Sequence, residues 1–194
     1  MTSFLNLSEL QAPFSLFPKV FILEGGAAAK SAFHLHVRVR NNLLKKGKNF
    51  LLPKTESYFQ ALIQKKTDVL LGFAHKEKLA GIVSLVVFDN LFSAKKGGAI
   101  ATPYFKESLV KQCGKAPVGV VQSFCVENLS KELKASKNLL GAVSSYAQKQ
   151  KIENLFAQVP HKNKPSWGCF LKNDYVINAS WHVPTKKFLL HCTV

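Results

Sequence analysis

Two kinds of apolar pattern alternate along this chain and together predict its secondary structure. Short apolar runs bounded by glycine, proline or charged residues are typical of strands. The runs of this kind are 17–26, the two halves of 67–90, 117–126, 153–160, and 176–194, which Pro184 divides into two strands. The polar HKEK between the two halves of 67–90 is typical of a β-hairpin.

Other segments place apolar residues at helical spacing. Thr55 can cap a helix, because its hydroxyl can accept a hydrogen bond from an unpaired amide of the first turn. The pattern over 27–46 also favours a helix, although residues 36–40 alternate as a strand would. The predicted helices are 27–46, the segment after Thr55, the amphipathic part of 126–147, and a short helix within 163–175.

Residues 90–116 interrupt this alternation with a glycine pair, Pro103 and several lysines, and a short helix is predicted over 104–112. The segment is longer than an ordinary connection, so we expect an insertion or a lid facing a substrate. The order of elements predicts a single α+β domain over residues 1–194. Its mixed sheet includes a strand–helix–strand unit at 117–160, which should be a right-handed parallel crossover.

The charge of the chain is strongly unbalanced, with 27 Lys and Arg against 11 Asp and Glu and a formal net charge of +16. Apart from Arg38 and Arg40 these cations are lysines, which recognise bases and phosphates less specifically than arginine does. The surplus favours a polyanionic partner, such as nucleic acid, an anionic membrane or a phosphorylated ligand. The lysines occur as scattered pairs, however, which is also typical of an ordinary solvated surface.

Several classes of protein are disfavoured by the sequence. No run of about 18 apolar residues exists, so no membrane span is expected, and Lys19 is the first lysine, so no secretory signal is expected. The four cysteines lack C-x-x-C spacing and the His and Cys neighbours occur only in twos, so no metal site is predicted. Cys125 and Cys169 lie in apolar runs and are predicted to be buried thiols. A reducing, cytoplasmic location is therefore expected.

The order of elements resembles that of the GNAT superfamily of acyl-CoA-dependent N-acyltransferases. The central motif of that superfamily is a strand, V-x-P-x-x-[QR]-x-x-G-x-[GA], and a helix. VENLSKELKAS at 126–136 aligns with this motif without a gap. Val126 matches the end of the strand, and Lys131 stands where Gln or Arg is usual. Lys134 and Ser136 occupy the positions of the two small residues.

A later motif of the superfamily, N-x-x-[AS]-x-x-x-Y-x-K-x-G-F, resembles NKPSWGCFLKNDY at 163–175. Asn163 matches its first residue, and the aromatic Tyr175 stands in the place of Phe. Phe170 replaces the Tyr that often protonates the leaving thiolate. The resemblance therefore implies that the proton donor is either missing or another group. The whole resemblance covers about residues 17–182, most of the chain.

The resemblance implies that acetyl-CoA, or another acyl-CoA, binds at the end of the strand 117–126, with its pyrophosphate on the amides that open the next helix. Such amides lack intrahelical partners and lie at the positive end of the helix dipole. Lysine charge would partly replace the close fit that glycine gives. The residues implied to bind the cofactor are Phe124, Val126, Lys131, Glu132, Leu133, Lys134, Ala135, Ser136, Asn163 and Phe170.

The implied reaction is attack of a neutral amine on the thioester carbonyl, which needs a base, an oxyanion donor and an acid for the thiolate. The resemblance assigns the oxyanion to a main-chain amide at Val126 or its neighbour. Glu127 is the nearest carboxylate for the base, although it also suits an exposed turn. Tyr175, Tyr146 or water is left for the acid. Cys125 has no predicted His partner, so packing is the better interpretation of its thiol.

Two functions remain open at this stage. One is an N-acyltransferase that moves an acetyl or other acyl group from acyl-CoA to an amine acceptor, which the sequence does not identify. The other is a weak or inactive GNAT-like module that binds a polyanion such as RNA through its basic surface. Four aromatic residues are candidates for lining an acceptor pocket: Tyr58, Phe59, Tyr104 and Phe105. The same residues also suit packing in the core or in a lid. The final strands often pair between copies in the superfamily, which leaves a homodimer open.

Overall fold

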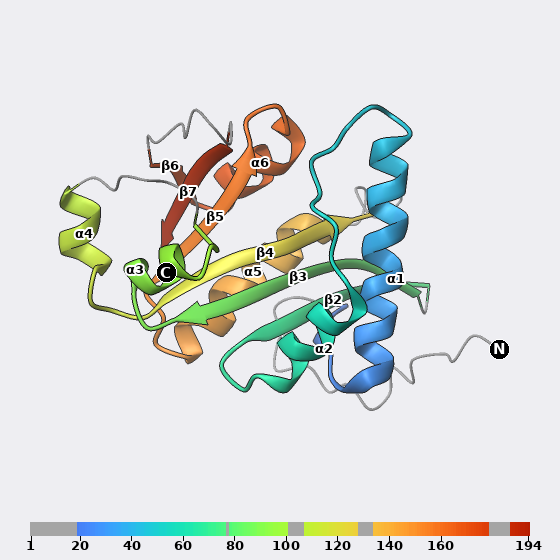
Figure 1. The fold of residues 1–194 in the computed structure, drawn as a ribbon, viewed down its shortest axis with the longest axis horizontal. Coiled ribbons are helices and arrows are strands. Elements are labelled where there is room, and N and C mark those ends of the chain that lie inside the picture. The colour runs from blue at the N-terminus through green and yellow to red at the C-terminus, as the bar shows by residue number, and fades with distance from the viewer. Residues whose placement is uncertain (1–18, 77, 101–106, 128–133, 179–186) are drawn as a thin grey trace. The chain divides into compact units, whose positions relative to one another are not determined.

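The computed structural model describes residues 19–76, 78–100, 107–127, 134–178 and 187–194. Its strands are β1 (Val20–Ile22), β2 (Val69–His75), β3 (Lys78–Phe88), β4 (Val118–Val126), β5 (Asn154–Pro160), β6 (Val176–Ile177) and β7 (Lys187–Thr193). Its helices are α1 (Gly25–Leu44), α2 (Glu56–Gln64), α3 (Leu91–Lys96), α4 (Glu107–Cys113), α5 (Ala135–Lys149) and α6 (Lys164–Leu171). Figure 1 shows these elements from α1 in blue to β7 in red.

The described strands form one mixed sheet in the order β1-β2-β3-β4-β5-β7-β6. β4 and β5 pair in parallel from Val118↔Asn154 to Val121↔Ala157, with α5 between them in the chain. The pairs β1–β2, β5–β7 and β6–β7 are antiparallel. This mostly antiparallel sheet with helices, and its parallel strand–helix–strand unit, confirms the predicted α+β fold.

The local signals in the sequence explain the first two helices. α1 continues through residues 36–40, so the helical interpretation of that stretch is right and the strand-like alternation is not used. Thr55 is the N-cap of α2, and its Oγ1 accepts a hydrogen bond from the amide of Tyr58 at 3.3 Å. The predicted cap therefore fixes where α2 begins.

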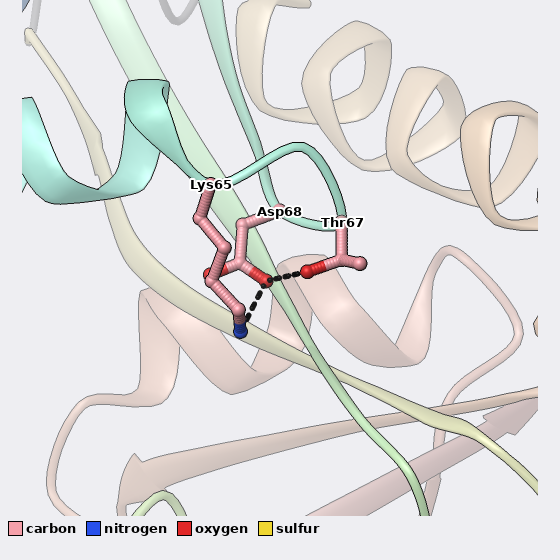
Figure 2. A network of polar contacts seen from close by, with 3 residues as sticks. All are labelled: Lys65, Thr67 and Asp68. Atoms are coloured by element: carbon pink, nitrogen blue, oxygen red, sulfur yellow. Dashed lines mark hydrogen bonds and ion pairs between the residues drawn. The ribbon is translucent and has the colours of Figure 1, made fainter.

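The turn after α2 is closed by one buried carboxylate (Figure 2). Lys65 Nζ lies 3.1 Å from Asp68 Oδ1, and Thr67 Oγ1 donates to the same oxygen at 3.3 Å. The amide of Asp68 also bonds to the carbonyl of Lys65 at 3.0 Å. These contacts satisfy the carboxylate while the chain passes from α2 into β2.

The segment 90–116 contains two helices rather than one. α3 was not predicted, and the Asn90 side chain caps it by accepting a hydrogen bond from the amide of Ser93 at 2.9 Å. α4 corresponds to the helix predicted over 104–112, whose first residues, with Tyr104 and Phe105, lie outside the described residues. Buried residues of both helices share one core cluster with β4, β5 and β7: Leu91, Ala94, Ile100, Leu109, Cys113, Val118, Val120, Phe156 and Leu189. A role of the segment over a substrate stays a prediction.

The chain divides into two compact units, one of residues 1–84 and 123–143, the other of residues 85–122 and 144–194. In the first unit, α5 lies close against β3, because a Cβ on Gly81 would lie only 3.0 Å from Leu139 Cδ1. In the second unit, a Cβ on Gly119 would lie 2.7 Å from Leu155 Cδ2. Both glycines thus permit tight packing on the sheet. A single domain over the whole chain stays a prediction.

Two buried histidines link the stability of the protein to pH. His36 Nε2 donates to the Leu52 carbonyl at 3.0 Å, and His191 Nε2 donates to Asn154 Oδ1 at 2.9 Å. Burial, the main cause, lowers the pKa of both side chains, and the cations Lys54 and Arg40 lower that of His36 further. Both histidines are therefore neutral in the fold at a pH where an exposed histidine begins to take up a proton.

We predict that the free energy of unfolding falls as the pH is lowered from about 7.5 to 5.5, because the unfolded chain then binds protons that the folded chain excludes. Each histidine contributes at most about 1.4 kcal/mol per pH unit. Urea unfolding at several pH values measures the slope. His191→Gln should flatten it and His34→Gln, at an exposed position, should not. A slope unchanged by His191→Gln would contradict this account.

Candidate functional site

The first feature of the site is a break in the extended backbone of β4. Ser123 has a φ of +49°, a left-handed value that is uncommon for a residue with a side chain and marks a local distortion of the strand. The parallel ladder with β5 is formed before this point, up to Val121. Ser123 is buried, and its hydroxyl donates to the hydroxyl of Tyr58 at 3.2 Å. α2 therefore supports the distorted residue from a position 65 residues away in the chain.

A cation lies over the aromatic ring that makes this contact. Lys54 Nζ is 3.9 Å from the centroid of the Tyr58 ring, and both side chains are half-buried. Phe59, the neighbouring candidate for an acceptor pocket, is instead fully buried, and its ring meets His36 edge to face. Of this aromatic pair only Tyr58 is partly exposed, while Phe59 belongs to the core.

The second feature is an ion pair at the end of β4. Arg38 Nε donates to Glu127 Oε1 at 2.5 Å, and the Glu127 side chain is 27% exposed. The Glu127 amide also bonds to the carbonyl of Ala80 in β3 at 2.8 Å. The carboxylate is thus placed by α1 and the sheet, and is not the fully exposed turn residue that the sequence also allowed.

The residues before Glu127 alternate between packing and partial exposure. Phe124 and Val126 are half-buried, and Val126 Cγ2 lies 3.3 Å from the place of a Cβ on Gly81. Cys125 is buried, and burial, reinforced by the nearby Glu127, raises the pKa of its thiol to about 12. A thiol that stays protonated is a poor nucleophile, which agrees with a packing role for Cys125.

The third feature is the start of α5, where the sequence predicts a phosphate loop. Lys134, at the place of the first glycine of the motif, has a φ of +54°, a conformation that glycine adopts more readily than other residues. Its carbonyl accepts the bond from the amide of Asn138 at 3.0 Å, the earliest helical hydrogen bond of α5 between residues that the structure describes. Lys131, Glu132 and Leu133 lie outside the described residues.

The described side chains at this helix start are small or positively charged. Ala135 is fully buried, Ser136 is small and half-buried, and the exposed Lys134 and Lys137 carry positive charge. An anion at this end would meet the amides of the first turn, the positive end of the helix dipole and two lysine side chains. The described residues at this helix start therefore fit a pyrophosphate, and Lys134 has a φ that glycine would favour.

The remaining predicted residues belong to the second unit. Asn163 precedes α6, where its carbonyl accepts from the amides of Ser166 and Trp167 and its side chain makes no cap. Phe170 is buried and its ring meets that of Tyr175 edge to face, with centroids 5.0 Å apart. Their assignment to the cofactor site stays a prediction.

Tyr175, the predicted acid, is a buried side chain. Its hydroxyl has no hydrogen-bond partner among the described residues, and burial raises its pKa well above the usual range. A phenol in this state holds its proton strongly, so its place as proton donor stays a prediction. Cys169, expected to be a buried thiol, is only partly buried on α6.

Sequence reasoning missed the contacts that organise the first unit, namely Arg38 with Glu127 and Tyr58 with Ser123. One available signal was the rarity of arginine in this lysine-rich chain. The planar guanidinium group holds its N–H donors in a fixed geometry that suits carboxylates better than a lysine does. Ser123 carried no signal. Among the described residues, no three His, Cys, Asp or Glu side chains are grouped as metal ligands. No helix in the same part of the chain is long and apolar enough to cross a bilayer.

Comparison with known proteins extends this picture at the level of the fold. No protein-family model matches the chain, and no curated protein matches it by sequence. A GNAT-family acetyltransferase from Streptococcus pneumoniae superposes with a TM-score of 0.59 at 14% identity, over 90% of this chain and 99% of that chain. Arabidopsis thaliana NAA60 in complex with acetyl-CoA superposes with a TM-score of 0.62 at 12% identity, over 90% of this chain and 97% of that chain. FeeM, an N-acyl amino acid synthase from uncultured soil microbes, gives 0.61 at 14% identity, over 90% of each chain.

Proposed function

Because the chain has the fold of the GNAT acetyltransferases, we propose that it is an N-acyltransferase that transfers an acetyl group from acetyl-CoA to an amine. The observation that carries the proposal is the start of α5, where Lys134 has a left-handed backbone in the place of glycine and its carbonyl accepts the bond from the amide of Asn138. Arabidopsis NAA60, a protein of this fold, was crystallised with acetyl-CoA. The fold and the helix start thus support the same donor.

In this proposal the donor is held by the end of β4 and the first turn of α5. The amides of Ala135 and Ser136 bind its phosphates, and Lys134 and Lys137 neutralise their charge. The donor supplies an acetyl group activated as a thioester. Phe124 and Val126 lie along the thioester end, with a main-chain amide near Val126 as the oxyanion donor. Asn163 and Phe170 are assigned to the donor by resemblance.

The acceptor amine must lose a proton before or during its attack on the thioester carbonyl. Glu127 is the proposed base, held by Arg38 until the amine displaces or shares that contact. Tyr58 is a positioning residue, because its hydroxyl holds the distorted Ser123 of the central strand. FeeM is named for making N-acyl amino acids, so we include free amino acids among the acceptors to be tested.

The proposal is tested by calorimetric titration of acetyl-CoA into the protein at low and moderate salt. 3′,5′-ADP serves as a control for loose attraction of phosphates to a chain of net charge +16. Saturable one-to-one binding that persists at moderate salt, followed by acetyl transfer in a screen of amines, is the expected result. Binding no stronger than that of the ADP control would contradict it. In that case a polyanion-binding module, the second hypothesis from the sequence, becomes the leading function.

We predict that Ser136→Glu weakens acetyl-CoA binding at least about tenfold, or ~1.4 kcal/mol. The new carboxylate would stand in the first turn of α5, where it repels the phosphates and competes for the same amides. Gln148→Glu adds the same charge on the last turn of α5 and serves as the matched control. If the two variants bind acetyl-CoA with equal affinity, the start of α5 is not part of the donor site.

A further inference from the structure

The connection from α1 to α2 carries an unusual concentration of positive charge and apolar side chains. From Gly25 to Thr55 the chain contains no Asp or Glu, and seven cations: Lys30, Arg38, Arg40, Lys45, Lys46, Lys48 and Lys54. The end of α1 and the connection that follows read LLKKGKNFLLPK over 43–54. In Figure 1 it leaves the end of α1 in cyan and returns as a long loop to α2.

Two leucines of this connection are exposed to solvent. Leu52 is 61% exposed and Leu44 is 39% exposed, although leucine is a residue that proteins usually bury. Single exposed leucines are ordinary on a protein surface, but in the sequence these two lie on either side of three exposed lysines, Lys45, Lys46 and Lys48. We call Leu44, Leu52 and these three lysines the loop patch.

The backbone around the loop patch is held in place. His36 Nε2 donates to the Leu52 carbonyl at 3.0 Å, and Arg40 Nε donates to the Leu51 carbonyl at 3.2 Å. His36, Arg40 and Leu44 are spaced four residues apart, so they follow one side of α1 and the loop runs back along that side. The exposure of Leu52 is therefore a feature of an anchored loop and not of a frayed end.

The lysines are also fixed by the way α1 ends. The amide of Lys45 bonds to the Asn41 carbonyl, and those of Lys46 and Lys48 both bond to the Leu43 carbonyl, at 2.9–3.0 Å. Gly47, with a φ of +67°, lets the chain turn there. The backbones of the three exposed lysines thus lie in one tight turn at the end of the helix, directly after Leu44.

We propose that the loop patch docks the protein on an anionic lipid surface. Lysines near such a surface are attracted by its negative potential, and apolar side chains beside them can enter the boundary of the acyl region. A nucleic acid would use the same lysines but gains nothing from aliphatic leucines, and it is usually gripped by arginine or stacked aromatic rings. Arg38 and Arg40 are instead engaged with Glu127 and the loop. The combination of fixed leucines and lysines favours lipid.

The test is sedimentation of the full chain with vesicles of phosphatidylcholine alone and of phosphatidylcholine with phosphatidylserine. Wild type should bind only the anionic vesicles. The variant Lys45→Gln/Lys46→Gln/Lys48→Gln should bind about a hundredfold more weakly, since each lysine near the surface contributes about a fivefold change in affinity. Leu44→Ser/Leu52→Ser should lose at least tenfold while keeping every charge.

Two control variants separate the patch from general charge and general exposure. Lys95→Gln/Lys96→Gln/Lys149→Gln removes three exposed lysines elsewhere, and Phe92→Ser/Leu171→Ser removes two apolar side chains that are 51% and 38% exposed. Both should bind the vesicles as wild type does.

Three results would overturn the proposal. They are no binding to anionic vesicles, equal losses in the patch and control variants, and full vesicle binding by Leu44→Ser/Leu52→Ser. A parallel titration with single-stranded RNA shows whether the lysines serve a nucleic acid instead, in which case the lysine variant loses RNA binding and the leucine variant keeps both activities. None of these results depends on acyl transfer.

Discussion

Glu127→Gln is expected to lower the rate of acetyl transfer at least a hundredfold while leaving the affinity for acetyl-CoA within about twofold. A positioned general base contributes roughly 10²–10⁴ to a rate, and an amide cannot take up the proton of the amine. Gln has the shape of Glu and can still accept a hydrogen bond from Arg38, so the end of β4 should keep its geometry. The rate is measured as thiol release with an amine identified in the acceptor screen.

The control for this prediction is Arg38→Met, which removes the ion pair but keeps the carboxylate. Its effect on stability should be at most about 1 kcal/mol, because the Arg38 side chain is 51% exposed and exposed ion pairs contribute little. Its effect on the rate should be smaller than that of Glu127→Gln, since only the orientation of the base is lost. If both variants lower the rate of acetyl transfer by the same small factor, Glu127 only positions the end of β4 and water accepts the proton of the amine.

Phe156→Ala should destabilise the second unit by about 3–5 kcal/mol, the usual cost of deleting a buried aromatic side chain. The Phe156 ring is fully buried within the cluster shared by α3, α4, β4, β5 and β7, and it stacks on His191 with centroids 4.7 Å apart. Its loss leaves a cavity beside the buried ring of His191, which donates a hydrogen bond to Asn154. Urea unfolding with intrinsic fluorescence measures the change.

The matched control is Phe92→Ala, on α3 at the surface, which should change the free energy of unfolding by about 0.5 kcal/mol or less. Because Phe156 shares the core cluster with residues of α3 and α4, a loss no larger than that of the control would show that residues 90–116 pack less tightly than the structure indicates. The same experiment therefore tests whether this segment is part of the core.

Local chemistry explains which parts of the fold could be predicted from the sequence. Thr55 caps α2 through an amide three residues away, and the apolar run of 117–126 corresponds to β4 almost residue for residue. α3 was missed because it has only six residues and its cap, Asn90, resembles the end of a hairpin strand. Short elements with a single local signal are decided by packing, which here is the burial of Leu91 and Ala94.

The candidate site was predicted less fully, because it depends on contacts between distant parts of the chain. Arg38 and Glu127 are 89 residues apart, and Tyr58 and Ser123 are 65 apart, so no spacing rule connects them. The left-handed φ of Ser123 is equally invisible, since Ser has no strong preference for that conformation. Resemblance to a family pointed to the strand end and the next helix, but not to the side chains that support them.

The left-handed φ of Lys134 has a consequence for how such proteins are identified. Its backbone takes the shape that glycine favours, at a cost of about 1 kcal/mol or more for a residue with a Cβ. The function of such a turn is performed by main-chain amides, which every residue except proline possesses. A sequence pattern that requires glycine specifies the residue type, whereas the ligand would contact the backbone amides. Chains with this fold and a substituted turn are better found by comparing shapes, as the match of this chain to GNAT structures at only 12–14% identity illustrates.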